Sequence, residues 1–141
     1  MILGKYSIIQ IEGFYGLKNG SKLVIEPVFK ELLWFEYNKF IAQNEDEKWL
    51  IVNDLGNNIL GEEFDRLHQF KNGVATFQKS NEFIFVNGYD VFKRVKFYNP
   101  DAYFNSSGLS IIQTEDGREG VILENGEWFL TPAFPQTLTS A

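Results

Sequence analysis

The chain has 141 residues, of which 19 are acidic and 13 basic, so its net charge is −6, and it contains no cysteine. An acidic domain repels the phosphate backbone of nucleic acids, and a chain without cysteine has neither disulfides nor thiolate metal sites. No charged segment followed by an apolar one opens the sequence, and no apolar run is long enough to span a bilayer. We therefore expect a cytoplasmic protein that binds neither nucleic acid nor membrane.

Aromatic residues make up 16% of the chain, which also has 12 glycines. This composition favours strands joined by tight turns over helices. In chain order, short aromatic and β-branched runs predict strands at residues 15–19, 49–53, 83–87 and 119–123. Turn residues that tolerate positive φ close these runs, as in Asn19-Gly20. We predict about ten to thirteen short antiparallel strands, with residues 65–71 as the one place for a helical turn.

The predicted strands recur at a nearly constant spacing. The steps from residue 15 to 49 and from 49 to 83 are 34 residues each, and the step from 83 to 119 is 36 residues. A second motif recurs as Ile25-Glu26-Pro27-Val28-Phe29 and Leu130-Thr131-Pro132-Ala133-Phe134, and residues 59–64 form a version without proline. We expect Pro27 and Pro132 to follow directly after a strand. The repeat divides the chain into a partial unit 1–13, units 14–47, 48–81, 82–117 and 118–135, and a tail 136–141.

These motifs resemble the WG repeat, also called the KWG repeat, a bacterial β-repeat of similar period. That family has an aromatic-Gly-aliphatic strand, an Asn/Asp-x-x-Gly turn and an aliphatic-x-Pro-x-aromatic segment. The resemblance covers about residues 4–135 and is strongest over 15–29 and 120–134. No Trp-Gly dipeptide is intact, because the positions read Tyr15-Gly16, Trp49-Leu50, Phe83-Ile84 and Glu119-Gly120. The resemblance implies degenerate copies of a repeat that is defined by its shape and carries no catalytic residues.

The predicted fold is all-β, with about four repeats of 34–36 residues forming stacked antiparallel β-hairpins in a single domain. A repeat of this size cannot bury its apolar face alone, so the units have to fold together. In-register phenylalanines are predicted to fill the core between units. These are Phe29, Phe35, Phe64, Phe70 and Phe134.

The sequence contains no recognisable catalytic, cofactor or metal motif. His68 is the only histidine, and no serine lies in a G-x-S-x-G motif, so we expect His68 to serve packing rather than catalysis. Gly16 and Gly20-Ser21-Lys22 lack the spacing of a phosphate-binding loop. Residues 44–49 are rich in oxygen ligands but have Trp49 where a calcium loop needs glycine. We predict a protein that is not an enzyme and has no cofactor and no metal.

Two groups of residues are candidates for binding a protein partner. Aromatic residues off the repeat pattern suit interface anchors, namely Trp34, Tyr37, Tyr98 and Tyr103. The second group consists of the acids in the hairpin turns, which stacking is expected to bring to one edge. They are Glu12, Glu45, Asp46, Glu47, Glu82, Glu115 and Asp116. These acids either steer a basic partner or simply keep a sheet edge charged against aggregation.

A small acidic chain with no cofactor motif has the profile of a non-catalytic protein-binding module. Within that class we favour a cytoplasmic inhibitor or immunity protein that neutralises a cognate bacterial toxin, by analogy of class. Its partner is then a protein, and a basic toxin domain is the leading candidate. The alternatives are a general scaffold or adaptor, and a lectin-like domain that binds carbohydrate or cell wall.

Overall fold

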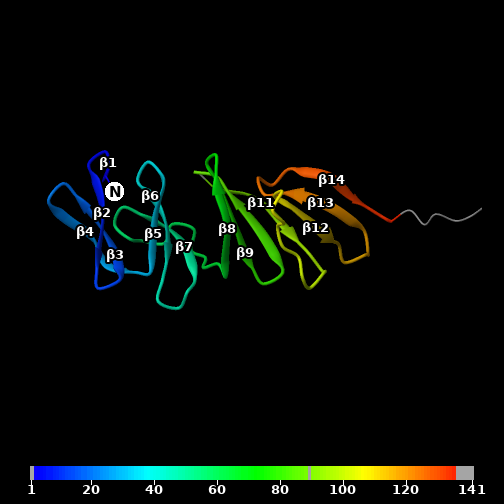
Figure 1. The fold of residues 1–141 in the computed structure, drawn as a ribbon, viewed down its shortest axis with the longest axis horizontal. Coiled ribbons are helices and arrows are strands. Elements are labelled where there is room, and N and C mark those ends of the chain that lie inside the picture. Colours follow the sequence, from blue (N-terminus) through cyan, green and yellow to red (C-terminus); the bar gives the residue numbers. More distant parts are fainter. Residues whose placement is uncertain (1, 89, 136–141) are drawn as a thin grey trace, which may run out of the picture. The chain divides into compact units, whose positions relative to one another are not determined.

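A computed structural model describes residues 2–88 and 90–135, so the predicted tail at 136–141 lies outside the described residues. The described residues form fourteen β-strands and no helix, which confirms the all-β prediction. The strands pair into four small antiparallel sheets (Figure 1), each built from strands that are consecutive in the chain. Such meanders are what repeated hairpins produce. The count exceeds the predicted ten to thirteen, partly because the two-residue strand β1 is included.

The four sheets follow one another along the sequence. The first sheet contains β1 (Ile2–Leu3), β2 (Tyr6–Ile11), β3 (Phe14–Asn19) and β4 (Lys22–Phe29). The second contains β5 (Glu31–Glu36), β6 (Lys39–Gln43) and β7 (Trp49–Asn53). The third contains β8 (Arg66–Lys71), β9 (Val74–Lys79), β10 (Glu82–Val86) and β11 (Val91–Lys96). The fourth contains β12 (Leu109–Gln113), β13 (Glu119–Leu123) and β14 (Trp128–Ala133).

The sequence-derived repeat is visible in the strand register. One hairpin recurs in every sheet, and its central cross-strand pairs are Ile8–Leu17, Ile41–Ile51, Thr76–Phe85 and Ile111–Val121. Two residues beyond the first member of each pair stands a glutamine, namely Gln10, Gln43, Gln78 and Gln113. The predicted unit boundaries at residues 14, 48, 82 and 118 fall at the turns of these hairpins. Each sheet therefore combines the end of one predicted unit with the beginning of the next.

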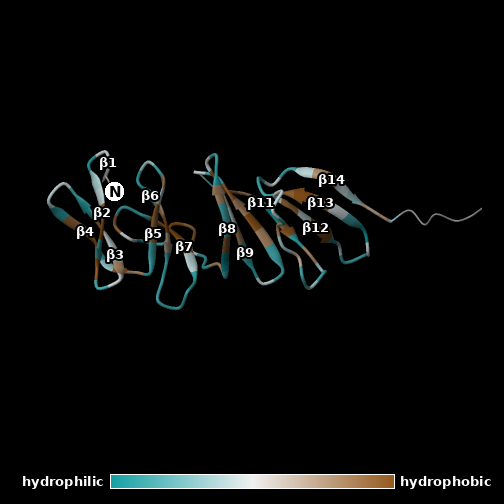
Figure 2. Ribbon diagram, viewed as in Figure 1, coloured by the Kyte–Doolittle hydropathy of each residue, from teal (hydrophilic) through white to brown (hydrophobic). Residues whose placement is uncertain are grey.

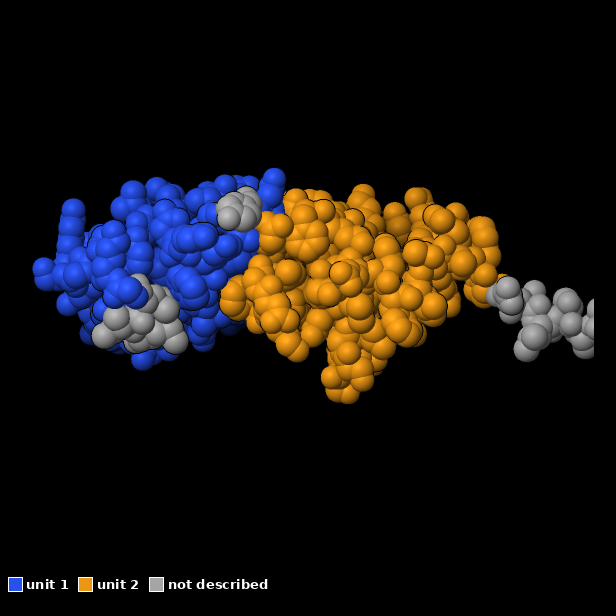
Figure 3. Space-filling view, turned by 90° about the horizontal axis from the view of Figure 1, so that it is seen from above, with its two compact units in different colours: residues 1–67, 88–90 blue, residues 68–87, 91–141 orange. Residues whose placement is uncertain are grey.

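The chain divides into two compact units (Figure 3). Unit 1 comprises residues 1–67 and 88–90, and unit 2 comprises residues 68–87 and 91–141. Unit 1 holds the first and second sheets, and unit 2 holds the fourth sheet and most of the third. The single-domain organisation stays a prediction.

The core of unit 1 lies between its two sheets. Leu17 and Ile25 of the first sheet pack in one cluster with Phe40 and Val52 of the second. The ring of Tyr6 meets Phe40 edge-on at a centroid distance of 5.9 Å. Figure 2 shows the same division along the chain, with apolar residues on the strands and hydrophilic residues in most turns. Burial of this shared apolar layer is the main source of stability for the pair of sheets.

The core of unit 2 is richer in aromatic rings. Phe83 and Phe85 of the third sheet pack in one cluster with Ile112 and Ile122 of the fourth. Phe104, from the segment before β12, lies 4.8 Å from Phe83 between ring centroids. Tilted and edge-on arrangements of this kind add to the stabilisation that area burial alone provides.

Several local predictions were wrong. Residues 65–71 form no helical turn, because residues 66–71 are strand β8. Pro27 and Pro132 lie inside β4 and β14 rather than after a strand, and both strands are at a sheet edge, where a missing N–H costs little. Phe29, Phe35 and Phe64 are buried as expected, but Phe70 and Phe134 are exposed. Phe70 is on the edge strand β8 and Phe134 follows the edge strand β14, so neither has a sheet neighbour on its outer side.

The aromatic-Gly and aliphatic-x-Pro motifs meet in space. A Cβ atom added to Gly16 would lie 2.5 Å from the carbonyl oxygen of Ile25 and 2.9 Å from the nitrogen of Pro27. At Gly120 the corresponding distances are 2.8 Å to Leu130 O and 2.9 Å to the nitrogen of Pro132. In both sheets the register shifts at this point, so the proline strand bulges toward the glycine.

The other two sheets lack both members of this pair. Leu50 and Ile84 occupy the glycine position, and both side chains are buried. In the third sheet Ile84 pairs regularly with Arg94. In the second sheet the segment opposite Leu50 pairs with β7 through two isolated bridges, at Asn58 and Phe64, rather than as a strand. The glycine is thus required only where a proline-containing bulge presses against it.

We predict that Gly16→Ala and Gly120→Ala each lower the free energy of unfolding by about 2–4 kcal/mol, because the new methyl group overlaps backbone atoms that cannot rotate away. Urea unfolding followed by circular dichroism measures the loss. The control is Gly20→Ala, where an added Cβ meets nothing within 4 Å and only the positive φ resists, at a cost of about 1–2 kcal/mol. Equal losses at positions 16 and 20 would contradict the steric explanation.

Two buried hydroxyl groups in unit 2 allow a second prediction. Thr76 donates a hydrogen bond to the carbonyl oxygen of Glu124, whereas Ser110 Oγ has no hydrogen-bond partner among the described residues. A buried polar group without a partner costs about 1–3 kcal/mol. We therefore expect Ser110→Ala to stabilise the protein by about 1 kcal/mol and Thr76→Val to destabilise it by about 1–3 kcal/mol. The two unfolding midpoints should move in opposite directions, and a loss of stability in Ser110→Ala would show that its hydroxyl is satisfied.

Candidate functional site

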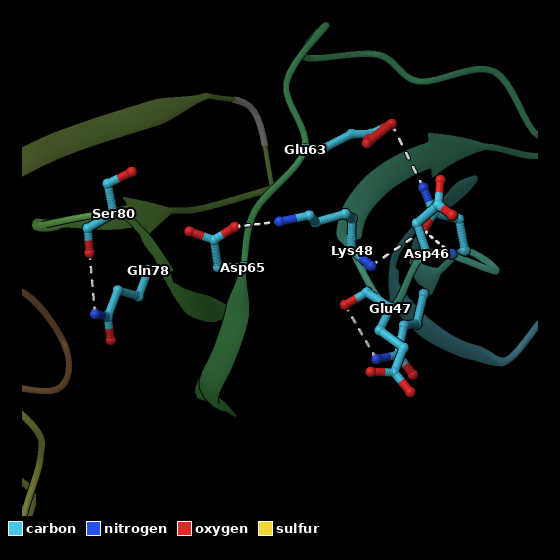
Figure 4. Close-up of polar contacts among 9 residues, drawn as sticks. Asp46, Glu47, Lys48, Glu63, Asp65, Gln78 and Ser80 are labelled. Carbon is cyan, nitrogen blue, oxygen red and sulfur yellow. Dashed lines mark hydrogen bonds and ion pairs between the residues drawn. The ribbon is translucent and has the colours of Figure 1, made fainter.

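The acidic turn at residues 44–48 has a defined hydrogen-bond pattern (Figure 4). The side-chain oxygen of Asn44 accepts hydrogen bonds of 3.0 Å from the amides of Asp46 and Lys48. The backbone of Asn44 also accepts from the Glu47 amide at 3.0 Å. The residue that begins the turn therefore orders it, and it keeps Glu45, Asp46 and Glu47 exposed.

The turn at residues 114–118 has the same backbone pattern with threonine in place of asparagine. Thr114 Oγ1 accepts from the Arg118 amide at 2.9 Å and donates to a carboxylate oxygen of Asp116 at 2.5 Å. Both Asp116 oxygens also accept from Arg118 Nε at 3.1 Å. The Thr114 hydrogen bond, followed by the Arg118 guanidinium, lowers the pKa of the Asp116 carboxyl below its usual value.

Glu47 departs from this pattern in its backbone. It has φ of 63°, where the turn at 114–118 has Gly117 with φ of 88°. The left-handed conformation costs a residue with a side chain about 1–2 kcal/mol. The sequence thus keeps a third acid in the turn at some expense of stability.

Unit 1 brings two acidic turns to the same end. Phe29 at the end of β4 pairs with Tyr15, the second residue of β3. The turn that carries Glu12 lies directly before β3. Two residues after Phe29, Glu31 pairs with Gln43, which immediately precedes the turn at 44–48. Because so short a segment joins the two sheets there, both turns must lie on one side of the unit, as Figure 1 shows.

Unit 2 repeats the arrangement with Glu82, Glu115 and Asp116. The amide of Phe97 donates to the carbonyl of Asn81, in the β9–β10 turn next to Glu82. The amide of the following residue, Tyr98, donates to the carbonyl of Gln113, which immediately precedes Thr114. Adjacent residues therefore connect the two acidic turns of this unit.

Basic side chains neutralise some of these acids. Glu47 pairs with Lys30 at 3.2 Å, and Glu82 pairs with Arg94 at 2.9 Å. Lys48 Nζ lies 2.6 Å from Asp65 Oδ1, outside the turn at 44–48 (Figure 4). The hydrogen bond to Asp65 raises the pKa of Lys48. Exposed pairs of this kind contribute little to stability.

Other acids of the turns keep their charge uncompensated. Within the described part of the chain, Glu12, Glu45 and Glu115 are exposed and make no ion pair. Lys30 and Arg94 were not predicted as counterions, because they pair with acids that are 17 and 12 positions away in the sequence. The most negative part of each unit's acidic end is therefore the tip of the turn.

The four predicted aromatic residues are all exposed, and two of them lie in each unit. Trp34 Nε1 donates to the carbonyl of Tyr37 at 2.9 Å in the β5–β6 hairpin. This hairpin is at the opposite end of β6 from the acidic turn. In unit 2, Tyr98 lies at the acidic end beside Gln113, and Tyr103 lines a cavity of about 290 Å³ with Asp101.

Other polar groups in unit 2 act in packing. His68 Nε2 lies 2.7 Å from Gln78 Oε1, and its ring meets Phe83 edge-on at 5.3 Å. Lys93 in β11 donates to the carbonyl of Gly126 at 2.6 Å and lies 5.1 Å from the ring centroid of Trp128. Burial lowers the pKa of Lys93.

A cavity of about 680 Å³ in unit 2 is lined in part by groups that bind each other. Gln69 Nε2 donates to Thr76 Oγ1 at 2.8 Å and to the carbonyl of Glu124 at 3.0 Å, and Lys93 on the cavity wall is held by Gly126. These bonds join the third and fourth sheets.

Among the described residues, no cluster of three His, Asp or Glu side chains could hold a metal ion. No helix long and apolar enough to cross a membrane occurs in the same residues. No protein-family model matches the chain, and the search of curated proteins gives no match. The resemblance to the WG repeat accordingly stays a prediction.

The hydrogen bond at Asp116 gives a prediction for pH dependence. We expect the Asp116 carboxyl to titrate below the usual range of aspartate, and Thr114→Val to raise its pKa because that change removes the largest cause of the shift. The charged form is favoured in the folded state, so its stabilising contribution exists above the unfolded-state pKa and disappears as pH falls through the folded-state value. Side-chain ¹³C NMR titration measures both variants. Thr131→Val, at an exposed threonine in β14, is the control and should leave Asp116 unchanged.

Proposed function

We propose that the chain is a degenerate WG-type repeat protein that acts as a non-catalytic protein-binding module. The observation that supports this most is the pairing of acidic turns at one end of each unit, through Lys30–Gln43 in unit 1 and Tyr98–Gln113 in unit 2. Asn44 and Thr114 hold two of these turns in a fixed shape. A preordered acidic loop loses little conformational entropy when it binds a partner.

Within this class we favour an inhibitor, of the immunity-protein type, that neutralises a toxin with a basic active surface. A toxin that acts on nucleic acid needs such a surface to bind phosphate groups. Exposed carboxylates at Glu12, Glu45 and Glu115 can occupy that surface and accelerate association by electrostatic steering. The chain's net charge of −6 acts in the same direction.

The test is a charge reversal confined to the turn tips. We replace Glu45, Asp46 and Glu115 with lysine, and leave Glu47 and Asp116 in place because they hold ion pairs. A control with the same change in charge replaces Glu26 in β4 and Glu124 and Glu127 in the β13–β14 turn, which is at the opposite end of β13 from the turn at 114–118. The partner is captured from producing cells with the wild-type protein and identified, and its association rate is then measured at low and high salt.

We expect the turn variant to associate at least about tenfold more slowly than the wild type at low salt and to lose most of its salt dependence. Co-expressed with a toxin so identified, the wild type and the control should protect cells, and the turn variant should not. If both variants bind equally with unchanged salt dependence, the acidic turns are only solvated sheet edges. Turnover of a substrate by the purified protein would contradict the non-catalytic assignment.

One observation favours a lectin-like function as the second candidate. Tyr103 is exposed beside a cavity of about 290 Å³, where Asp101 supplies a carboxylate. An aromatic face next to a polar group can bind a sugar ring, but the other amides in this cavity are engaged: Asn99 binds the backbone of Ile111, and Asn105 orders its own turn. A glycan array separates the two candidates.

A further inference from the structure

Sheets stack by the same rule in both units. In unit 1, the first sheet packs with the face that carries Ile8 and Leu17 against the face of the second sheet that carries Phe40 and Val52. In unit 2, the third sheet packs with its Phe85 face against the Ile122 face of the fourth. We call the face with the Ile8–Leu17 register position the leading face of a sheet, and the opposite one its receiving face.

The leading face of the fourth sheet is apolar and uncovered. Its central pair is Ile111–Val121, and Leu130 pairs with Val121 on the next strand. Ile111 is 60% exposed and Leu130 57% exposed. At the position equivalent to Ile111, Ile41 of the second sheet and Thr76 of the third are fully buried, and Ile8 of the first is half-buried.

This face is also hollowed. A depression of about 340 Å³ lies among Ile111, Val121, Leu130 and Phe134. Exposed apolar surface that is contiguous across three strands indicates an interaction site rather than isolated surface residues. Its only charged residue on β12 or β13 is Glu119, at the margin beside Gln113.

The first sheet presents the complementary surface. Its receiving face carries Ile9 opposite Gly16, and Ile11 opposite Phe14. Leu23 faces the same side, because it pairs with Lys18 next to inward-facing Leu17. Ile11 is 51% exposed and Leu23 39% exposed. Both faces are apolar at their centres, and each also carries one charged residue on its central strands, Lys18 on the first sheet and Glu119 on the fourth.

We propose that the chain associates head to tail with a second copy of itself, the leading face of its fourth sheet packing on the receiving face of the partner's first sheet. The two faces occupy the register positions that already pack sheet on sheet inside each unit. The contact is heterologous, so each copy keeps one face of each kind available and association can continue. The acidic turns lie at the ends of strands and not on these faces, so this inference is independent of the proposed function.

The test uses two variants that each remove one face. Ile111→Glu places a charge on the leading face of the fourth sheet, and Leu23→Glu places one on the receiving face of the first sheet. Both changes are to glutamate, so the altered faces repel each other. Leu55→Glu is the control, because Leu55 is 62% exposed in the turn after β7 and belongs to neither face. Circular dichroism and thermal unfolding verify that all three variants are folded.

Sedimentation equilibrium over about a hundredfold range of concentration measures the association. We expect the average mass of the wild type and of Leu55→Glu to rise with concentration, and each face variant to remain at the monomer mass of 16.3 kDa. An equimolar mixture of the two face variants should form a 1:1 dimer and nothing larger, because one intact pair of faces remains. A wild type that stays monomeric throughout overturns the proposal, and so does association by Leu23→Glu alone, which would show symmetric pairing of fourth sheets.

Discussion

A sheet of three or four short strands has two faces and too little area to be stable with both of them exposed. The rest of the structure follows from the need to cover these faces. Leu17 and Phe85 fill equivalent positions in two different sheets, and each lies in the core shared with the following sheet. Since one register position decides what is buried, a slip of one residue would exchange the core and solvent faces of a whole sheet. The turns that fix the register are therefore as important to stability as the core itself.

The same register explains why acids collect where they do. Two of the recurring hairpins reverse direction at a turn whose first residue, Asn44 or Thr114, satisfies turn amides with its side-chain oxygen. Glu45 and Glu115 in these turns are exposed and are not needed to satisfy the turn amides. Carboxylates can accumulate there without being desolvated, and the short segment after Phe29 places two such tips together in unit 1.

The strand pattern was predictable from the sequence because it depends on local chemistry. Repeated β-branched runs and turn residues with positive φ are visible without knowledge of the fold, and they located the strands at 15–19, 49–53, 83–87 and 119–123. Burial was less predictable, since Phe70 and Phe134 match the repeat but lie on or beside edge strands. The repeat pattern in the sequence does not show which strands lie at a sheet edge, and so it does not show which phenylalanines are exposed.

For the candidate site, sequence reasoning found the acidic turns but not their counterions. Lys30 reaches Glu47, and Arg94 reaches Glu82, only after strands from different parts of the chain have paired. The aromatic candidates illustrate the same limit. Trp34 and Tyr37 are close to the acidic turn in sequence, but a full strand separates them from it in the sheet.

The contact between glycine and the proline bulge also constrains how such repeats diverge. Where the bulge persists, Gly16 and Gly120 cannot acquire a side chain. Once a copy loses its bulge, the position is free to take a large residue, as Leu50 and Ile84 show, and that residue then becomes part of the core. A change back at only one of the two places is unfavourable. Glycine at position 50 or 84 without the bulge would leave a cavity in the core, and a bulge opposite the large side chain would overlap with it. The glycine with its bulge and the large buried residue without a bulge are therefore two self-consistent forms of the repeat, and a change from one form to the other requires both positions to change together.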